Sequence, residues 1–318
     1  MIKYTILVII GFMCLIKGAD IFVDGISSTS TNLKIPKIII SLTIVAFGTS
    51  TPELFISFES ILNGNNDMVI ANVVGSTIVN TMLIIGIAAL IKPMHIKNET
   101  IKRQLPLHLI MIGVFAIVLL DQILLGGKNS ITRNDALILL LIFIIFLIYI
   151  LRFNKKRNLF KELFKEKPKW NLPVSIFYSI LGLILIYLGS EITVNNCVNL
   201  AYELHVSEKI ITMVVLVIGT SAPELVMAIN SAKKGEFDII LGNIIGTNIF
   251  NIGFVLALPI LVFGTVDTYN FNLIDMFVMT FAGIIIYIFA KDDKKIDKNE
   301  GIIMLTVFIV YYIYILLT

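Results

Sequence analysis

Two glutamates lie inside long apolar stretches of the sequence, at matching places in its two halves. Glu53 belongs to Gly-Thr-Ser-Thr-Pro-Glu-Leu, and Glu224 belongs to Gly-Thr-Ser-Ala-Pro-Glu-Leu, 171 residues later. A carboxylate near the centre of a bilayer costs at least about 2.5–3.5 kcal/mol on insertion scales, and two that approach each other repel. No Lys or Arg lies within eight residues of either glutamate. The available partner is therefore a bound cation, or a proton on one carboxyl.

The residues around each glutamate can supply neutral oxygen ligands. A proline precedes each glutamate and lacks an N–H, so in mid-helix it breaks the hydrogen-bond ladder and frees carbonyls about one turn earlier. Serine, threonine and asparagine side chains add hydroxyl and amide oxygens. In each half, a hydroxyl residue lies four positions before an asparagine, so the two side chains share one helix face. These candidate ligands are Thr49, Ser50, Ser76 and Asn80 in the first half, and Thr220, Ser221, Thr247 and Asn251 in the second.

An all-oxygen set of this kind suits hard cations such as Ca²⁺ or Na⁺, and does not suit Zn²⁺ or Cu⁺. Two carboxylates balance the charge of one Ca²⁺, and the same oxygens could be shared among several Na⁺. The three histidines, His95, His108 and His205, have no metal-ligand spacing and are expected at the membrane interface. Asn72 and Asn243 could form packing hydrogen bonds or line a pore.

The composition places these residues in a membrane. Of the 318 residues 57% are hydrophobic and 15% charged, against roughly 45–50% and about 25% in soluble chains. The mean hydropathy is +0.94. Two cysteines exclude a disulfide scaffold. The basic residues form no face with interleaved aromatics, so no nucleic acid is expected as a partner. Motifs of intramembrane proteases and hydrolases are absent, so we expect a transporter and no enzyme.

Apolar runs of about 20 residues predict ten membrane-spanning helices. Most basic residues fall into alternate gaps between these runs. Under the positive-inside rule, this alternation places both termini outside the cell membrane. The predicted spans are 2–23, 36–62, 67–91, 104–120, 134–152, 173–200, 207–233, 238–263, 272–290 and 301–317.

The two halves of the chain are copies of each other. Between residues 48 and 80, 13 of 33 positions are identical to those 171 residues later. Each copy holds five spans, and because five is odd the second copy enters the membrane from the opposite side. The predicted fold is therefore an all-α polytopic membrane protein of two inverted five-helix repeats, with helices broken at an ion site between them. The first repeat covers 1–152, a basic cytoplasmic linker 153–172, and the second repeat 173–318.

The segments 48–80 and 219–251 resemble the paired repeats of the calcium/cation antiporter superfamily, the sodium/calcium exchangers. A doubled Gly-Thr-Ser-x-Pro-Glu motif, each followed by an Asn-x-x-Gly-Ser/Thr helix, carries the resemblance. The ten-span pattern extends it over the chain. Without the long cytoplasmic regulatory domain of the animal exchangers, the sequence is similar to the minimal prokaryotic members.

The resemblance implies a cluster of four cation sites. Glu53, Glu224, Thr49 and Thr220 would match the Ca²⁺ ligands. Outer and inner Na⁺ sites would use Ser50 with Ser76, Ser221 with Thr247, and the carbonyls of Ala46 and Val217, while Asn80 and Asn251 match the remaining central positions. Some members carry Asp at the position of Asn251, including the potassium-dependent exchangers, so potassium dependence is not expected. The resemblance further implies that the first and sixth spans slide together across a rigid core.

The sequence thus predicts a multi-pass plasma-membrane antiporter that exchanges Na⁺ for Ca²⁺ by alternating access. Its expected partners are these two ions and the lipid bilayer, with no cofactor and no obligate protein partner. A Ca²⁺/H⁺ exchanger using Glu53 or Glu224 as proton carrier is the alternative within the class, and a cation channel is the alternative outside it.

Overall fold

The computed structural model describes residues 2–62, 64, 66–124, 130–153, 167–204, 217–267 and 273–317, and almost all of them are helical. In these ranges, eight helices are long and apolar enough to cross a membrane, and one further span is a pair of helices bent by 50°. The large apolar side chains on the outer surface, such as Ile10, Phe277 and Ile309, are those expected of a protein that faces lipid. The chain is therefore an all-α polytopic membrane protein.

The first half begins with α1 (Ile2–Leu33), followed by the bent pair, which contains α2 (Lys37–Ile40), the π-helix η1 (Ser41–Val45), α3 (Ala46–Thr49) and α4 (Thr51–Leu62). A third span joins α5 (Asn66–Ile78), the π-helix η2 (Val79–Ile84) and α6 (Ile85–Ile91). After strand β1 (Met94–His95), the π-helix η3 (Thr100–Gln104) leads into α7 (Leu105–Leu124). Strand β2 (Ser130–Ile131) and α8 (Arg133–Phe153) complete this half.

The second half repeats this order with α10 (Leu172–Glu203), α12 (Val217–Thr220) and α13 (Ala222–Lys234). The next span joins α14 (Phe237–Phe250), the π-helix η6 (Asn251–Val255) and α15 (Ala257–Phe263). Strand β3 (Val266–Asp267), α16 (Leu273–Asp292), strand β4 (Lys295–Ile296) and α17 (Lys298–Leu317) follow. The predicted span 207–233 lies partly outside the described residues, so the count of ten stays a prediction.

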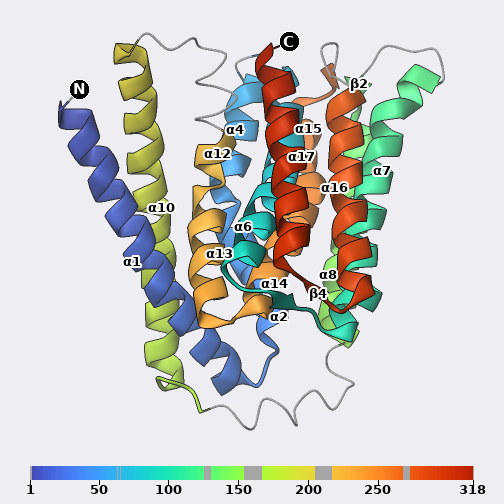
Figure 1. Cartoon of the computed structure of the whole chain (residues 1–318). Helices are drawn as coiled ribbons and strands as arrows, with labels where there is room; N and C mark the ends of the chain where they lie inside the picture. Colours follow the sequence, from blue (N-terminus) through green and yellow to red (C-terminus); the bar gives the residue numbers. More distant parts are fainter. Residues whose placement is uncertain are drawn as a thin grey trace.

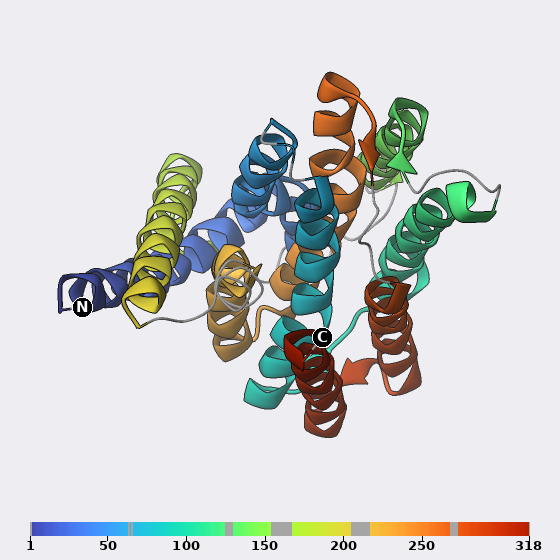
Figure 2. The same ribbon diagram turned by 90° about the horizontal axis from the view of Figure 1, so that it is seen from above.

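The two central spans are the most deeply buried. In the most apolar stretch of Met68–Ile91 72% of residues are buried, and in that of Phe237–Phe263 83% are, against 33% for α1 and 28% for α10. Figures 1 and 2 show α1 and α10 side by side at one edge of the molecule, beside the bundle formed by the other helices. The sites that need exclusion of lipid and water are therefore expected in the bundle.

Glycines let α1 and α10 pack at close range. Gly11, Gly18 and Gly25 recur every seven residues along α1 and face α10. A Cβ atom at Gly25 would lie 2.6 Å from the Ser179 backbone nitrogen, and one at Gly18 would lie 2.8 Å from the Ile186 nitrogen. Small residues of this kind permit close contact between helices in a membrane.

The predicted end of the first span, at residue 23, was too early. Helix α1 continues to Leu33 because its polar C-terminal turns also pack against α10. The Thr29 and Ser179 hydroxyls lie 3.3 Å apart in a buried hydrogen bond, and Asn32 Nδ2 donates to the Trp170 carbonyl at 2.8 Å. Hydrophobicity alone does not reveal a helix end that is held by such polar contacts.

Two short strand pairs connect the halves at opposite ends of the bundle. Strand β1 pairs antiparallel with β4, and β2 pairs antiparallel with β3. Figure 1 shows β4 at the lower end and β2 at the upper end. Each pair takes one strand from each half, which is the relation that inverted copies would have.

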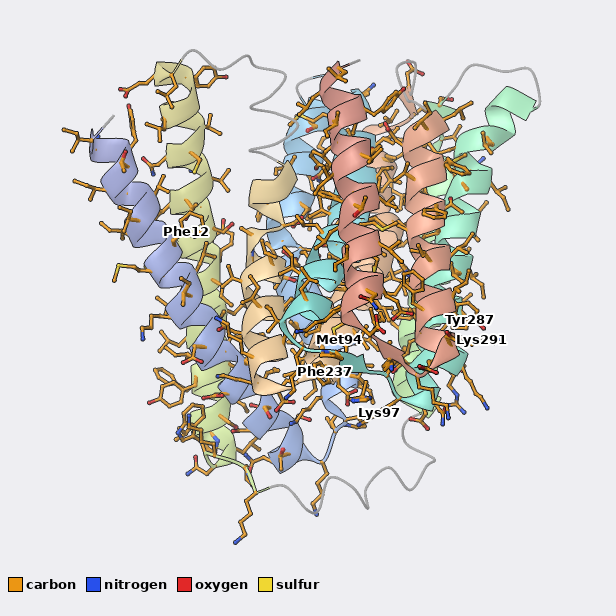
Figure 3. The ribbon with its side chains drawn as sticks, viewed as in Figure 1. Phe12, Met94, Lys97, Phe237, Tyr287 and Lys291 are labelled. Atoms are coloured by element: carbon orange, nitrogen blue, oxygen red, sulfur yellow. The ribbon has the colours of Figure 1, made fainter. Side chains whose placement is uncertain are left out.

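Both chain ends lie at the upper end of the molecule in Figure 1. Lys97 and Lys291 lie toward the opposite end in Figure 3. Lysines of the predicted inner gaps form ion pairs, Lys37 with Glu236 at 2.8 Å and Lys234 with Asp24 at 2.6 Å. The termini and these basic residues therefore belong to opposite faces of the bundle.

Candidate cation-binding site

The two glutamate motifs break their helices with the same backbone geometry. Helix α3 ends at Thr49 and α4 begins at Thr51, while α12 ends at Thr220 and α13 begins at Ala222. The residues between them, Ser50 and Ser221, have φ/ψ of −86°/6° and −85°/6°. The prolines cause this break because each lacks the N–H that would bond to the carbonyl four residues earlier. The predicted broken helices are therefore present in both halves.

The break leaves the carbonyls of Gly48 and Gly219 without that helical donor. In the second half, the Ser190 hydroxyl of α10 donates to the Gly219 carbonyl at 3.4 Å. Helix α10, at the edge of the molecule, thus contacts the broken segment directly. In the first half, a Cβ atom at Gly48 would lie 2.7 Å from a methyl of Leu183, also in α10.

Glu53 and Glu224 are the electrostatic centre of the site. Each lies in the first turn of its helix, α4 or α13, and each is 0% exposed. In the described structure, none of the four carboxylate oxygens is assigned a hydrogen-bond partner. The positive end of the helix dipole favours negative charge at both positions. That contribution is small beside the cost of two buried charges, so the arrangement calls for a cation.

Neutral oxygens surround the two carboxylates. Several of these oxygens are buried and have no hydrogen-bond partner in the described structure: the hydroxyls of Ser50, Ser221 and Thr247, and the side-chain carbonyl oxygens of Asn80 and Asn251. Buried polar atoms are almost always paired in folded proteins. A group of unpaired oxygens of this size next to two carboxylates has the composition of a site for a hard cation.

Hydrogen bonds across the halves bring the two sets of candidate ligands together. Asn251 Nδ2 donates to the Ser76 hydroxyl at 3.1 Å. The Thr49 hydroxyl donates to Asn243 Oδ1 at 3.3 Å. Both amides are therefore oriented by a residue of the other half, and Asn251 keeps its oxygen free.

Asn72 joins the broken helix to the span that follows it. Its Nδ2 donates to the Glu53 carbonyl at 3.2 Å and to the Ser57 hydroxyl at 3.4 Å. Of the two roles left open by the sequence, the structure shows the packing role for the Asn72 amide group. Its oxygen is buried without a donor.

The two central asparagines lie where their helices change geometry. Asn80 is the second residue of η2, and Asn251 is the first residue of η6. A π-helical turn widens the helix by one residue and leaves backbone groups less tightly paired, and such turns are frequent at functional sites. The hydrophobic pattern of these segments does not predict either π-helix.

The remaining predicted ligands are more fully engaged with the protein. The Ala46 carbonyl accepts the Ser50 N–H at 3.0 Å, and the Thr49 hydroxyl also contacts the Val45 carbonyl at 3.2 Å. Each of these oxygens retains a lone pair for an ion. Thr220 is buried in α12. Val217 begins α12, and its side chain lies outside the described set.

The prediction that His108 lies at the interface was wrong. The side chain is 1% exposed and lies within the bundle on α7, where its Nε2 is 3.2 Å from Asn248 Nδ2. Asn248 was not singled out because its counterpart 171 residues earlier is Thr77. The i, i+3 spacing of Asn248 and Asn251 was the signal that could have identified it. Among the described residues, no three His, Cys, Asp or Glu side chains cluster as a metal-binding group.

The sequence matches a known family along nearly its whole length. The family is described as "Sodium/calcium exchanger protein", and the match covers residues 3–152 and 174–317. A putative antiporter, CaxA of Alkalimonas amylolytica, is 36% identical over 323 residues, which covers 98% of each chain. The sodium/calcium exchanger MaX1 of Methanosarcina acetivorans is 27% identical and covers 97% of each chain.

The fold is also similar to that of a solved exchanger. The structure of the sodium-calcium exchanger NCX_Mj soaked with Na⁺ and Sr²⁺ superposes with a TM-score of 0.84 at 28% identity. The similarity covers 97% of both chains. The agreement therefore extends beyond the two motifs to the whole bundle.

Proposed function

This chain belongs to the sodium/calcium exchanger protein family, and on this basis we propose that it is a secondary-active antiporter that exchanges Na⁺ for Ca²⁺ by alternating access. Members of the family are membrane exchangers, so the chain is a multi-pass membrane transporter of cations. The identity of the coupling ion and the ligands of the site belong to the proposal.

One observation carries the proposal: Glu53 and Glu224 are both 0% exposed, and their four carboxylate oxygens have no assigned hydrogen-bond partner among the described residues. Two uncompensated negative charges in a low-dielectric interior are costly. One Ca²⁺ neutralises both charges and prefers carboxylate, carbonyl and hydroxyl oxygens. The same oxygens can hold Na⁺, whose binding then excludes Ca²⁺ because both ions need the same two carboxylates.

The mutual exclusion gives a mechanism for exchange. An empty site holds two carboxylates that repel each other, and this repulsion opposes closure around them. Binding of Ca²⁺, or of enough Na⁺, removes the repulsion and permits the site to close and reopen on the other side. A ligand can drive such a change because it binds the closed form more tightly than the open one.

The ligand set is divided between the ions as follows. Ca²⁺ would be held by Glu53, Glu224, Thr49 and Thr220. Na⁺ would use the same carboxylates together with Ser50, Ser76, Ser221, Thr247 and the Ala46 and Val217 carbonyls, with Asn80 and Asn251 at the centre. A neutral amide at Asn251 in place of a carboxylate argues against potassium dependence.

The orientation of the chain is part of the proposal. The opposite placement of the termini and of Lys97 and Lys291 supports extracellular termini and a cytoplasmic basic face in the plasma membrane. The separate family matches to 3–152 and 174–317 support two repeats joined by a basic linker at 153–172.

Flux measurements on purified protein in proteoliposomes test the proposal. Vesicles loaded with Na⁺ and diluted into Na⁺-free medium, with the same pH on both sides, should take up ⁴⁵Ca²⁺. A vesicle loaded with choline at the same pH is the matched control and should take up little. Uptake that ignores Na⁺ and follows a pH gradient would indicate a Ca²⁺/H⁺ exchanger. Uptake without any counter-ion, down the Ca²⁺ gradient alone, would indicate a channel.

A further inference from the structure

A buried polar network lies directly behind Asn80 and includes a histidine that the proposed exchange does not use. Asn80 Nδ2 donates to Asn248 Oδ1 at 3.1 Å, and Asn248 Nδ2 donates to the Thr81 hydroxyl at 3.0 Å. Asn248 Nδ2 also lies 3.2 Å from His108 Nε2. Asn80, Thr81 and Asn248 are 0% exposed, and His108 is 1% exposed.

The placement of the Asn248 amide, with its nitrogen toward Thr81 and His108, assigns His108 the role of hydrogen-bond acceptor. The Asn248 amide nitrogen is a donor only, so His108 Nε2 must be the acceptor and must carry no proton. The ring is then neutral with its hydrogen on Nδ1. Nδ1 is buried without a hydrogen-bond partner in the described structure, and burial disfavours a charged ring.

The hydrogen bonds of Asn248 also determine how the Asn80 side chain is oriented at the ion site. With both amide hydrogens of Asn248 committed to Thr81 and His108, its oxygen accepts from the Asn80 amide nitrogen. The Asn80 oxygen is consequently the atom left free, and it is buried without any protein partner. If the Asn80 side chain rotated by half a turn, an N–H₂ group would take that place, and an N–H group cannot bind a cation.

Among the described residues, no equivalent network surrounds Asn251 in the second half. Asn251, the counterpart of Asn80, donates its amide to the Ser76 hydroxyl. At the same offset of 171 residues, Asn248 corresponds to Thr77 and His108 corresponds to Met279. Thr77 donates only to the Val73 carbonyl of its own helix, at 2.8 Å. The histidine therefore serves one of the two central amides.

We propose that His108 is a positioning residue for ion binding: through Asn248 it holds the Asn80 side chain with its oxygen, and not its nitrogen, facing the transported cations. The inference rests on the proposed function, because it assigns Asn80 Oδ1 to the ions. His108 itself touches no ion. Removal of its acceptor nitrogen frees the Asn248 amide to rotate, and the orientation of Asn80 is lost with it.

Equilibrium binding of ⁴⁵Ca²⁺ to purified protein tests the proposal without requiring turnover. His108→Leu keeps an apolar side chain of similar size but removes the acceptor, and it should weaken Ca²⁺ binding about tenfold, the effect of one buried hydrogen bond. His108→Gln places an amide oxygen where Nε2 lies and should restore binding to within about threefold of the wild type. Wild-type affinity in His108→Leu would overturn the proposal.

A second background separates positioning from a general structural role. In Asn80→Asp, both terminal atoms are oxygens, so no partner is needed to orient them. His108→Leu should then have no further effect on Ca²⁺ affinity in that background. A loss of similar size in both backgrounds would show that His108 does not act through Asn80. If His108→Leu fails to fold, Thr81→Val, which removes the other acceptor of Asn248, should weaken binding in the same direction and lose its effect with Asn80→Asp.

Binding of Ca²⁺ to the wild-type protein separates a failure of the proposed function from a failure of the role of His108. Absence of Ca²⁺ binding by the wild-type protein would contradict the proposed function itself. Wild-type binding together with an unaffected His108→Leu variant would contradict only the role of the histidine.

Discussion

The two copies of the ion site are alike in their charged parts and different in the support of their amides. Each copy breaks its helix at a serine with φ/ψ near −86°/6° and places one buried, unpartnered glutamate in the turn that follows. The central asparagines differ, because Asn80 is held by Asn248 and Asn251 by Ser76. The two carboxylates, whose charge selects the ion, are thus placed in the same way in both copies. The hydrogen bonds to the two asparagines differ, but both arrangements leave the amide oxygen free.

The largest effect is expected from neutralising either glutamate, and it tests whether the two copies contribute equally to transport. Glu53→Gln and Glu224→Gln should each reduce Na⁺-driven Ca²⁺ uptake by about 100-fold or more, since removal of one partner from a buried charge arrangement costs about 3–5 kcal/mol. Uptake into proteoliposomes measures the loss, and size-exclusion chromatography checks that the variants fold.

Glu300→Gln is the matched control for this pair. Glu300 Oε2 accepts the Asp297 N–H at 2.8 Å at the start of α17, and an amide oxygen can make the same bond. This variant should transport like the wild type. A large loss in only one of the two site variants would mean that the two copies are not equivalent in charge.

The next largest effect is expected where α14 of the second half packs against η1 and α3 of the first half. A Cβ atom at Gly246 of α14 would lie 2.6 Å from the Leu42 carbonyl oxygen and 2.9 Å from the Ala46 Cβ. Gly246→Ala should therefore lower the free energy of unfolding by about 1–3 kcal/mol through overpacking. Thermal unfolding in detergent measures the change.

Gly113→Ala on α7 is the control, because in the described structure no atom other than its chain neighbours and its own helix backbone lies within 4 Å of a Cβ there. It should leave the unfolding midpoint unchanged or raise it, since alanine favours a helix over glycine by about 1 kcal/mol. Equal midpoints for both variants would show that the close approach of α14 to α3 does not matter for stability.

The difference between the copies can be removed by one substitution. Asn248→Thr gives the second half the residue that the first half has at Thr77, and it removes the acceptor for the Asn80 amide. Ca²⁺ affinity should fall by about tenfold or less, in keeping with one or two lost hydrogen bonds. Unchanged affinity would mean that Asn80 keeps its orientation without Asn248.

The smallest effect is expected away from the site. Lys97 pairs with Asp238 at 2.8 Å, but the lysine side chain is 53% exposed. Exposed ion pairs contribute about 0–1 kcal/mol. Lys97→Ala should therefore change the unfolding midpoint little and leave Ca²⁺ uptake at the wild-type level. A clear loss of uptake would assign this pair a part in transport.

Much of the fold could be predicted because a helix that crosses a bilayer needs a long run of apolar residues, which is easily seen in a sequence. Within the described part of the chain, long apolar runs and the alternation of basic gaps anticipated the eight complete spans and the broken one. The positions where polar contacts override hydrophobicity were missed. Helix α1 runs ten residues past its predicted end because Thr29 and Asn32 bond to residues near the start of α10.

The site was predictable where its two copies agree in residue type. Glu53 and Glu224 stand out because their burial is costly and because the repeat duplicates it. His108 and Asn248 have no such duplicate, and their burial comes from the packing of α7 against α14, which the sequence does not display. The π-helices at Asn80 and Asn251 were also missed, because a single extra residue in a helical turn leaves no mark on the hydrophobic pattern.

In the proposed site, one carboxylate from each copy holds a single shared ion. Equilibrium ⁴⁵Ca²⁺ binding to the purified wild type, Glu53→Gln and Glu224→Gln tests it most directly. If the ion is shared, each wild-type chain binds one Ca²⁺ that Na⁺ displaces, and neither variant binds Ca²⁺ with high affinity. Two Ca²⁺ per wild-type chain, with one retained in each variant, would instead show two independent sites, each with its own carboxylate.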